Sequence, residues 1–279
     1  MAQPGSSFLR TQAGRGIASA LHLAARDVGP AELARPAIVF APHPDDETLG
    51  CGGTIIKKLA AGADVRVAFL TDGRTSHARL MPPEKLSAIR MDEARVAMEA
   101  LGLPSDNVSF LKLPSSRLAE NAEPAREKVA ELLSRHDPAQ VFVPYRRETL
   151  ADHLAANRAV LSAVRSCGRK VSVYEYPIWF WTHWPWMKLP PAGRRAIPGR
   201  LRSNVLASLR LLKDFRWRVY IADVLDKKRA ALDRYASQMT RLLPDRRWTT
   251  LGDVAGGEFL ERFFQEHEIF RRYTCGARA

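Results

Sequence analysis

One short stretch of this sequence, FAPHPDDETLGCGG over residues 40–53, brings together one histidine and three carboxylates. The stretch overlaps the end of an apolar run, AIVFAP, that is typical of a buried strand. Adjacent carboxylates repel one another, and a carboxylate at the end of a hydrophobic strand is costly unless something neutralises it. A bound cation would do so, and we therefore expect a metal site here.

The histidine and carboxylate types suit a zinc site. His43 and Asp46 lie three residues apart in a predicted turn, where an imidazole and a carboxylate can face one ion. Zinc accepts both donor types, and a catalytic site has three protein ligands and an open position for water. His153 is the natural third ligand, because it begins a helix just after a strand that ends at the same edge of the predicted sheet. His77, near another strand end, is a reserve ligand or a substrate contact.

The neighbouring acidic residues then have other roles. Asp45 is free to accept a proton from water that attacks a carbonyl, and to pass it to the leaving amine. Glu47 is expected to hold a ligand or the loop in place. The alternative is a solvated acidic turn that caps a helix, which the position after a buried strand disfavours. The glycines of GCGG match no phosphate-binding loop, so we expect close helix packing there, and Cys51 is expected to be a buried thiol.

Strand and helix patterns alternate along the chain up to residue 177. This alternation predicts an α/β fold with a Rossmann-like, doubly wound, mainly parallel sheet and helices on both faces. Sites in such sheets lie beyond the carboxyl ends of the strands. Three polar segments follow predicted strand ends and should converge there: HPDDE at 43–47, TDG at 71–73, and PYRRETLADH at 144–153.

The domain organisation follows from changes in composition. Residues 1–35 alternate small and basic residues and are expected to form an N-terminal extension, with a short helix. Residues 36–279 are expected to form a single α/β domain, in which 177–217 is an insertion or lid rich in tryptophan, proline and arginine. The competing interpretation of this stretch is a peripheral membrane contact through 179–202, where tryptophans and basic residues would meet anionic lipid.

Composition restricts the class of protein. The formal net charge is +13, from 43 basic and 30 acidic residues, but the arginines are scattered and no recognition motif accompanies them, which argues against nucleic-acid binding. Three cysteines without a CxxC pair exclude a disulfide scaffold. We find no secretory signal and no bilayer-spanning run, and we expect a cytoplasmic protein that is at most peripheral to the membrane. The sequence does not specify an oligomeric state.

These motifs carry a family resemblance. APHPDDETLGCGG resembles the AHPDDE signature of the PIG-L/LmbE-like N-acetylglucosaminyl deacetylases, zinc enzymes that remove acyl groups from amino sugars. The resemblance runs from about residue 36 to 165, through RMDEA at 90–94 and PYRRETLADH, and reaches thinly to KKRAALDRYASQ. It implies one zinc per chain on His43, Asp46 and His153, with Asp45 as the general base. It also implies a small N-acylated amino sugar or glycoconjugate as substrate.

One position departs from the family pattern. The second motif of the family usually reads His-x-Asp-His, and its first histidine helps near the substrate carbonyl, whereas this chain has Leu150 there. Either Asp45 acts alone as base and acid, or another group assists; the candidates are Arg74, His77 and His183. The function expected is zinc-dependent deacylation, and the alternative is a weakened or non-enzymatic metal-binding member of the fold. Asp152, a plausible N-cap, joins Glu47, Arg74 and His77 as residues expected to contact substrate or support the ligands.

Overall fold

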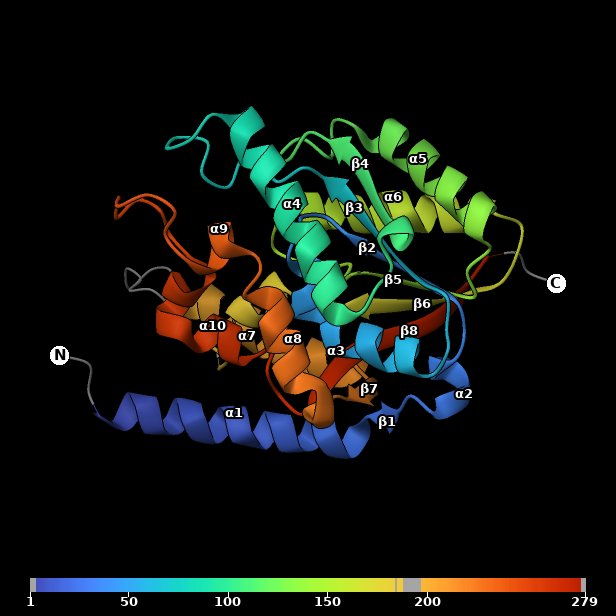
Figure 1. Ribbon diagram of the computed structural model, residues 1–279. Coiled ribbons are helices and arrows are strands. Elements are labelled where there is room, and N and C mark those ends of the chain that lie inside the picture. Colours follow the sequence, from blue (N-terminus) through green and yellow to red (C-terminus); the bar gives the residue numbers. More distant parts are fainter. Residues whose placement is uncertain (1–3, 184, 188–196, 277–279) are drawn as a thin grey trace.

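The computed structural model describes residues 4–183, 185–187 and 197–276 (Figure 1). An eight-stranded sheet runs through these residues in the order β1-β7-β8-β6-β5-β2-β3-β4. The strands are β1 (Arg26–Asp27), β2 (Ala37–Ala41), β3 (Val65–Thr71), β4 (Val108–Leu113), β5 (Gln140–Pro144), β6 (Val171–Tyr176), β7 (Trp217–Tyr220) and β8 (His267–Cys275).

The central five strands, β4-β3-β2-β5-β6, are all parallel, and β8 runs antiparallel between β6 and β7. The predicted Rossmann-like, mainly parallel sheet is therefore confirmed. The strand order reverses between β2 and β5, which is where such a sheet opens a crevice at its carboxyl edge.

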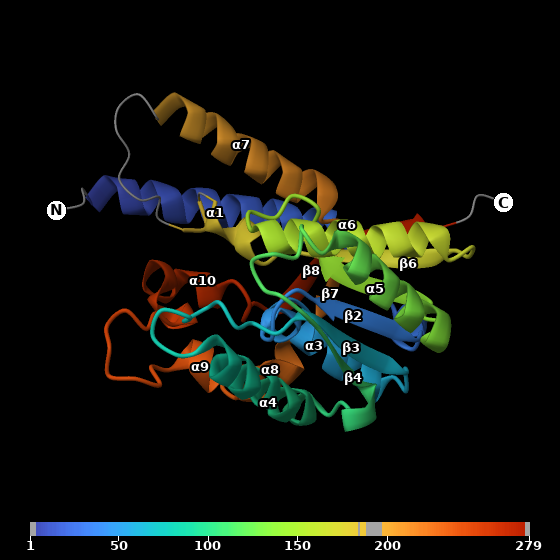
Figure 2. The same cartoon turned by 90° about the horizontal axis from the view of Figure 1, so that it is seen from above.

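Helices cover both faces of the sheet (Figures 1 and 2). Helices α5 and α6 pack together on one face, whereas α3, α4 and α8 contact one another on the other. The helices are α1 (Pro4–Ala24), α2 (Pro30–Leu33), α3 (Asp46–Ala60), α4 (Pro83–Leu101), α5 (Ala122–His136), α6 (Ala151–Ser166), α7 (Ile197–Asp214), α8 (Leu225–Leu232), α9 (Ala236–Met239) and α10 (Glu258–Glu261).

The apolar run that forms β2 belongs to two cores at once. All five residues of β2 are buried. Val39 and Ala41 belong to the core beneath α3, and Ile38 and Phe40 to the core beneath α5 and α6. Because alternate side chains of a strand point to opposite faces, a strand covered on both sides reads as a continuous apolar run.

The second half of the chain contains elements that the sequence patterns do not reveal. Helix α7 lies within the expected 177–217 insertion and packs beside the N-terminal helix α1 (Figure 2). The short 3-10 helix η2 (Trp179–Thr182) follows β6. Trp181 and Trp186 are buried in the main core, and the expected lid residues 188–196 lie outside the described residues.

Candidate metal centre and active site

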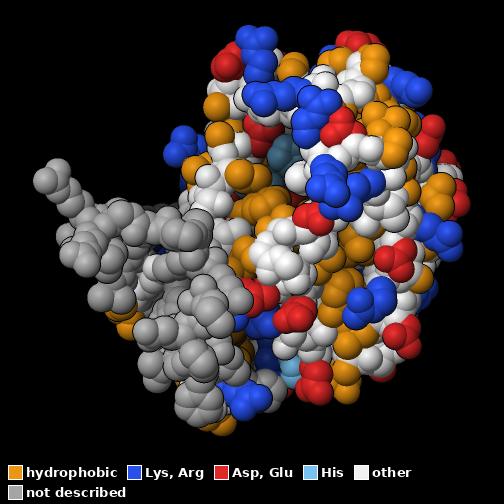
Figure 3. Space-filling model, turned by 90° about the vertical axis from the view of Figure 1, so that its left-hand side faces the viewer, with side chains coloured by type: hydrophobic (Ala, Val, Ile, Leu, Met, Phe, Trp, Pro, Cys, Tyr) orange, Lys and Arg blue, Asp and Glu red, His pale blue; other side chains and the backbone are white. Residues whose placement is uncertain are grey.

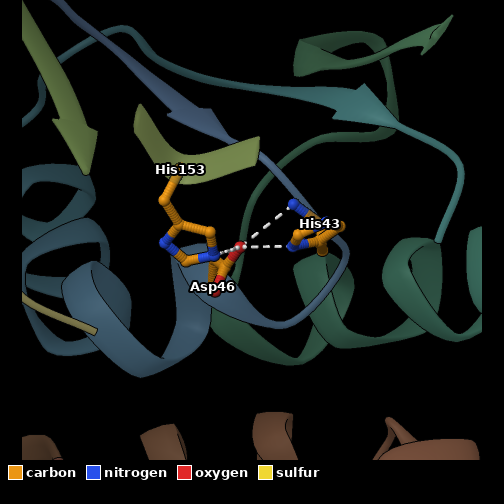
Figure 4. Close-up of side chains that lie close together, drawn as sticks. All are labelled: His43, Asp46 and His153. Atoms are coloured by element: carbon orange, nitrogen blue, oxygen red, sulfur yellow. Dashed lines mark hydrogen bonds and ion pairs between the residues drawn. The ribbon is translucent and has the colours of Figure 1, made fainter. Parts of the chain in front are cut away.

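Three side chains that the sequence predicts as ligands lie together at the carboxyl edge of the sheet, where the strand order reverses. His43 follows β2, Asp46 begins α3, and His153 lies in the first turn of α6. One donor atom of each lies within 4.8 Å of the others. Asp46 Oδ2 is 3.4 Å from His43 Nδ1 and 3.2 Å from His153 Nε2 (Figure 4). The three side chains therefore face a common point.

His153 supplies the test of whether a metal fits. Its side chain is fully buried, and neither ring nitrogen makes a hydrogen bond within the described part of the chain. A buried polar group without a partner is costly, and a divalent cation beside Nε2 would give that nitrogen a partner. Two imidazoles and one carboxylate are donors that zinc accepts. The residues present thus fit a zinc ion or a similar divalent metal.

Asp152 orients the first histidine. Its Oδ2 lies 3.0 Å from His43 Nε2 and accepts the Ser116 amide at 2.6 Å, while Oδ1 accepts the Leu118 amide at 3.2 Å. A carboxylate on one ring nitrogen fixes the orientation of a ligand histidine and leaves the other nitrogen to the metal. The predicted N-cap role of Asp152 is wrong: Leu150 occupies that position without a side-chain cap, because the Asp152 carboxylate is engaged by the loop after β4.

The electrostatics of the cluster favour a positive charge. Burial opposes a charge on His43, but the hydrogen bond with Asp152 and the carboxylate of Asp46 raise its pKa to about 9. Burial likewise opposes ionisation of Asp46, yet the adjacent His153 and His43 hold the pKa of Asp46 well below its usual value. A divalent cation would supply the positive charge that these carboxylates favour.

Asp45 lies beside the cluster in a strained backbone conformation, with φ 119° at the N-cap of α3. Such a conformation costs on the order of 1–3 kcal/mol and persists only where the surroundings fix it. Arg90 donates to Asp45 Oδ2 at 3.0 Å and to the carbonyl of Pro44, and Glu47 accepts the Asp45 amide at 3.1 Å. Burial raises the pKa of Asp45 to about 8, against the opposing effect of Arg90.

Glu47 is buried and holds the turn. Besides the Asp45 amide, it accepts the Thr48 hydroxyl at 2.5 Å and the Tyr235 hydroxyl at 2.6 Å. This geometry agrees with a supporting role. Tyr235 and Arg90 carry no role in the sequence-based site. The sequence does contain a signal for Arg90. It lies four residues after Leu86, and at this spacing the two side chains share the buried face of α4.

Three candidates for the missing helper lie elsewhere. Arg74 is paired with Asp72, Nε to Oδ2 at 2.6 Å. His77 stacks on Trp248 with ring centroids 4.1 Å apart, and its Nε2 lies 2.9 Å from a backbone carbonyl. His183 Nδ1 is likewise 2.8 Å from a carbonyl. The structure brings none of the three into the His43 cluster or among the residues that line its cavity.

The glycines of GCGG allow close packing of α3, as expected. A Cβ on Gly50 would lie 2.4 Å from the Tyr176 ring, and one on Gly53 would lie 2.5 Å from Ile221. Both distances are too short for any side chain without movement. Cys51, between these glycines, is fully buried, which agrees with its expected role as a core thiol.

A buried ion pair anchors α3 to the second half of the chain. Lys228 Nζ lies 2.7 Å from Glu268 Oε1, and both side chains are almost fully buried. Glu268 accepts the amides of Gly53 and Thr54 at 2.8 Å each, and Lys228 donates to the carbonyl of Leu49 at 2.8 Å. These contacts hold the helix that presents Asp46.

A cavity of about 290 Å³ opens over the cluster. His43, Asp45 and Asp46 form part of its wall. Figure 3 shows the left-hand side of the molecule as drawn in Figure 1, with hollows bordered by hydrophobic, basic and acidic side chains. The remaining lining residues include Leu49, Gly73, Thr75, Ser76, Arg90, Ser116, Leu150, Trp179, Gln238 and Leu251. A small organic molecule could therefore reach the cluster.

Comparison with known proteins finds a family model that matches part of the chain and a group of similar proteins. Residues 38–164 match the family model PIG-L, described as GlcNAc-PI de-N-acetylase. The chain is also similar to 1D-myo-inositol 2-acetamido-2-deoxy-alpha-D-glucopyranoside deacetylase of Rhodococcus opacus (strain B4). The two are 26% identical over 284 residues, which covers 88% of this chain and 94% of that protein.

Two solved structures share the fold. N,N'-diacetylchitobiose deacetylase from Pyrococcus horikoshii matches with a TM-score of 0.61 and 18% identity, over 98% of this chain and 94% of that one. GalB, the 4-carboxy-2-hydroxymuconate hydratase from Pseudomonas putida KT2440, matches with a TM-score of 0.54 and 16% identity, over 88% of this chain and 98% of that one. Because this fold accommodates both a deacetylase and a hydratase, the function must be argued from the site.

Proposed function

We propose that this protein is a zinc-dependent hydrolase that removes an acetyl or other acyl group from the nitrogen of an amino sugar or sugar-bearing metabolite; the match of residues 38–164 to the PIG-L family model supports this proposal. The observation that carries the proposal is the buried His153: neither ring nitrogen makes a hydrogen bond within the described residues, and Nε2 lies 3.2 Å from Asp46 Oδ2 and beside His43. The similarity to a deacetylase of an N-acetylated glucosaminide supports the substrate class.

His43, Asp46 and His153 would hold the ion. A zinc ion held there would supply Lewis acidity toward the amide carbonyl and toward water. Asp45 accepts the proton of the attacking water and then delivers it to the amide nitrogen, so that the amine leaves. Arg90 and Glu47 keep the Asp45 carboxylate and its backbone in place. The products are a carboxylic acid and the free amino sugar.

Leu150 supports the alternative, a protein that binds metal with weak or absent turnover. Its side chain lines the cavity at the position of the family's helper histidine, and it can neither donate a proton nor a hydrogen bond. Asp45 then carries both proton transfers.

Turnover tests the two alternatives. The purified chain, loaded with zinc, is incubated with a panel of N-acetylated amino sugars and their glycosides, and free amine is measured by fluorescence. Release of amine that disappears on chelation and returns with zinc supports the hydrolase. One zinc per chain with no amine release from any member of the panel would leave the non-enzymatic alternative. Absence of bound zinc would refute both.

We also propose that the protein acts in the cytoplasm and touches anionic membranes loosely through the region around 179–202. Trp181 and Trp186 are buried, which removes those rings from such a contact, whereas α7 has exposed apolar side chains just beyond residue 202. Val205 and Leu209 on α7 are 47% and 57% exposed, which favours an apolar contact. No helix in the described ranges has the length and apolar character needed to cross a membrane. Sedimentation with phosphatidylserine vesicles at low salt tests this contact, and a protein that stays in the supernatant refutes it.

A further inference from the structure

A second cavity lies beside helix α1, which runs along one side of the molecule (Figure 1). Its volume is about 340 Å³, which is within the usual range of sites for small organic ligands. Helix α1 supplies one wall, the segment after β6 supplies another, and β7, β8 and the residues just before β8 supply the rest. Among the described residues, it shares no lining residue with the cavity over the metal centre.

The walls of this cavity are held in place by contacts outside it. Near the start of α1, Arg10 donates two hydrogen bonds to Glu258, at 2.6 and 3.1 Å. Just after the end of α1, strand β1 pairs with β7. Trp181 and Trp186, in the wall after β6, are buried and lie edge to face with ring centroids 5.2 Å apart. The cavity is therefore formed before any ligand enters, which favours binding.

Arg262 brings a donor without an acceptor to this cavity. Its side chain is only 22% exposed, and Nε is buried with no hydrogen-bond partner in the part of the chain that the structure describes. Glu261 Oε2 lies 3.5 Å from Arg262 Nη2, which is longer than a hydrogen bond between charged groups. A buried donor without an acceptor is unfavourable, and a ligand oxygen would supply the acceptor.

The other ionisable groups of the lining leave this positive charge available. Arg218 is engaged with Asp27, Nε to Oδ1 at 2.7 Å and Nη2 to Oδ2 at 3.1 Å. Glu266 is exposed, so water solvates its carboxylate. His267 completes the ionisable residues that the structure describes in the lining. Two arginines therefore face one carboxylate, which favours an anionic ligand.

Apolar side chains complete the walls. Leu21 and Ile269 line the cavity together with the two tryptophans, and the Arg262 guanidinium lies 5.7 Å from the centroid of the Trp186 ring. A carboxylate accepts two parallel hydrogen bonds from one guanidinium. We propose that this cavity binds a small organic carboxylate, which pairs with Arg262 and packs an apolar or aromatic body against Leu21, Trp181 and Trp186. This site is separate from the proposed deacylation.

Ligands matched in shape test the charge. 2-Naphthoate, 2-naphthylmethanol and 2-naphthylmethylammonium have the same apolar body, and their binding to the zinc-loaded protein is measured by calorimetry. A charge-assisted hydrogen bond predicts that 2-naphthoate binds about tenfold or more tightly than the neutral alcohol. The ammonium should bind more weakly than the alcohol. Equal affinities within twofold for all three compounds overturn the inference.

Variants of Arg262 tie this preference to one side chain. Arg262→Met keeps the length of the apolar stem and should weaken 2-naphthoate binding about 10- to 100-fold, while binding of the alcohol stays within threefold. Arg262→Lys keeps the charge without the paired donors and should be intermediate. Arg229→Met is the control, because Arg229 also lies over an aromatic ring, 3.9 Å from the Phe264 centroid, and does not line the cavity. Unchanged 2-naphthoate affinity in folded Arg262→Met or Arg262→Lys would contradict the proposal.

The metal centre is another place where a carboxylate can bind, because zinc accepts carboxylate ligands. The titration of the parent protein and of Arg262→Met is therefore repeated after zinc has been removed with a chelator. Binding that persists without zinc and weakens in Arg262→Met supports the second site. Binding that disappears with zinc and is unchanged in Arg262→Met places the carboxylate at the metal centre and overturns the inference, while leaving the proposed function intact.

Discussion

Asp152→Asn tests how the centre selects the ligand nitrogen of His43. The carboxylate accepts three hydrogen atoms, from His43 Nε2 and from the amides of Ser116 and Leu118. An asparagine offers one accepting oxygen and one donating amide. If the amide group replaces Oδ1, it opposes the Leu118 N–H; if it replaces Oδ2, it opposes the His43 and Ser116 donors. Either orientation loses at least one bond and the negative charge.

The expected loss of metal affinity follows from the role of carboxylates that bond to a ligand histidine. Removing a carboxylate behind a ligand histidine costs about 10- to 100-fold in metal affinity, or about 1.4–2.7 kcal/mol. We therefore expect Asp152→Asn to bind zinc 10- to 100-fold more weakly, as measured by competition with a fluorescent zinc chelator. Asp223→Asn is the matched control, since Asp223 is 54% exposed and is paired with Lys57 away from the centre.

Thermal unfolding of both variants in the absence of zinc shows whether the fold is retained, which makes the affinity interpretable. A zinc affinity of folded Asp152→Asn within threefold of the parent protein would refute the reasoning. That outcome would mean that His43 is oriented by its backbone and by Asp46 alone, or that it does not bind the metal.

Further variants test the other assignments. Asp45→Asn should keep one zinc per chain and lose about 10²-fold or more in kcat, measured by amine release; loss of zinc would place Asp45 among the ligands. His153→Ala should lose bound zinc in elemental analysis, and full zinc content would remove it from the ligand set. Glu268→Ala should lower the free energy of unfolding by about 3–5 kcal/mol, measured in urea, because it leaves the Lys228 ammonium buried and unpaired. Adding Lys228→Met should restore part of this loss, and additive losses would contradict coupling of the pair.

The sequence predicted the centre because the relevant signals are local. The carboxyl ends of parallel strands share one edge, so residues that follow the apolar runs of β2 and β5 had to meet there. That is why His43 and His153, which are 110 residues apart in the sequence, could be paired without a structure. The orientation of Asp152 could not be read in this way, because its partners are backbone amides of the loop after β4.

The elements beyond β6 were harder to predict, for reasons visible in their residues. Strand β8 pairs with both β6 and β7, and basic side chains such as Arg271 and Arg272 interrupt its apolar pattern. Arg271 is nevertheless paired with buried Glu175, 3.1 Å away. When only the local sequence is read, an arginine whose charge is neutralised by a residue far away in the sequence looks like a surface residue.

The support of α3 shows that the centre depends on more than the matched family segment. Residues 38–164 contain the proposed ligands and base, yet α3 packs against Tyr176 and Ile221 and is held by Lys228 and Glu268, all of which lie beyond that segment. Tyr235 likewise fixes the Glu47 carboxylate that accepts the Asp45 amide. Because strain at Asp45 persists only while its surroundings impose it, the conformation of the proposed base depends on residues supplied by the second half of the chain.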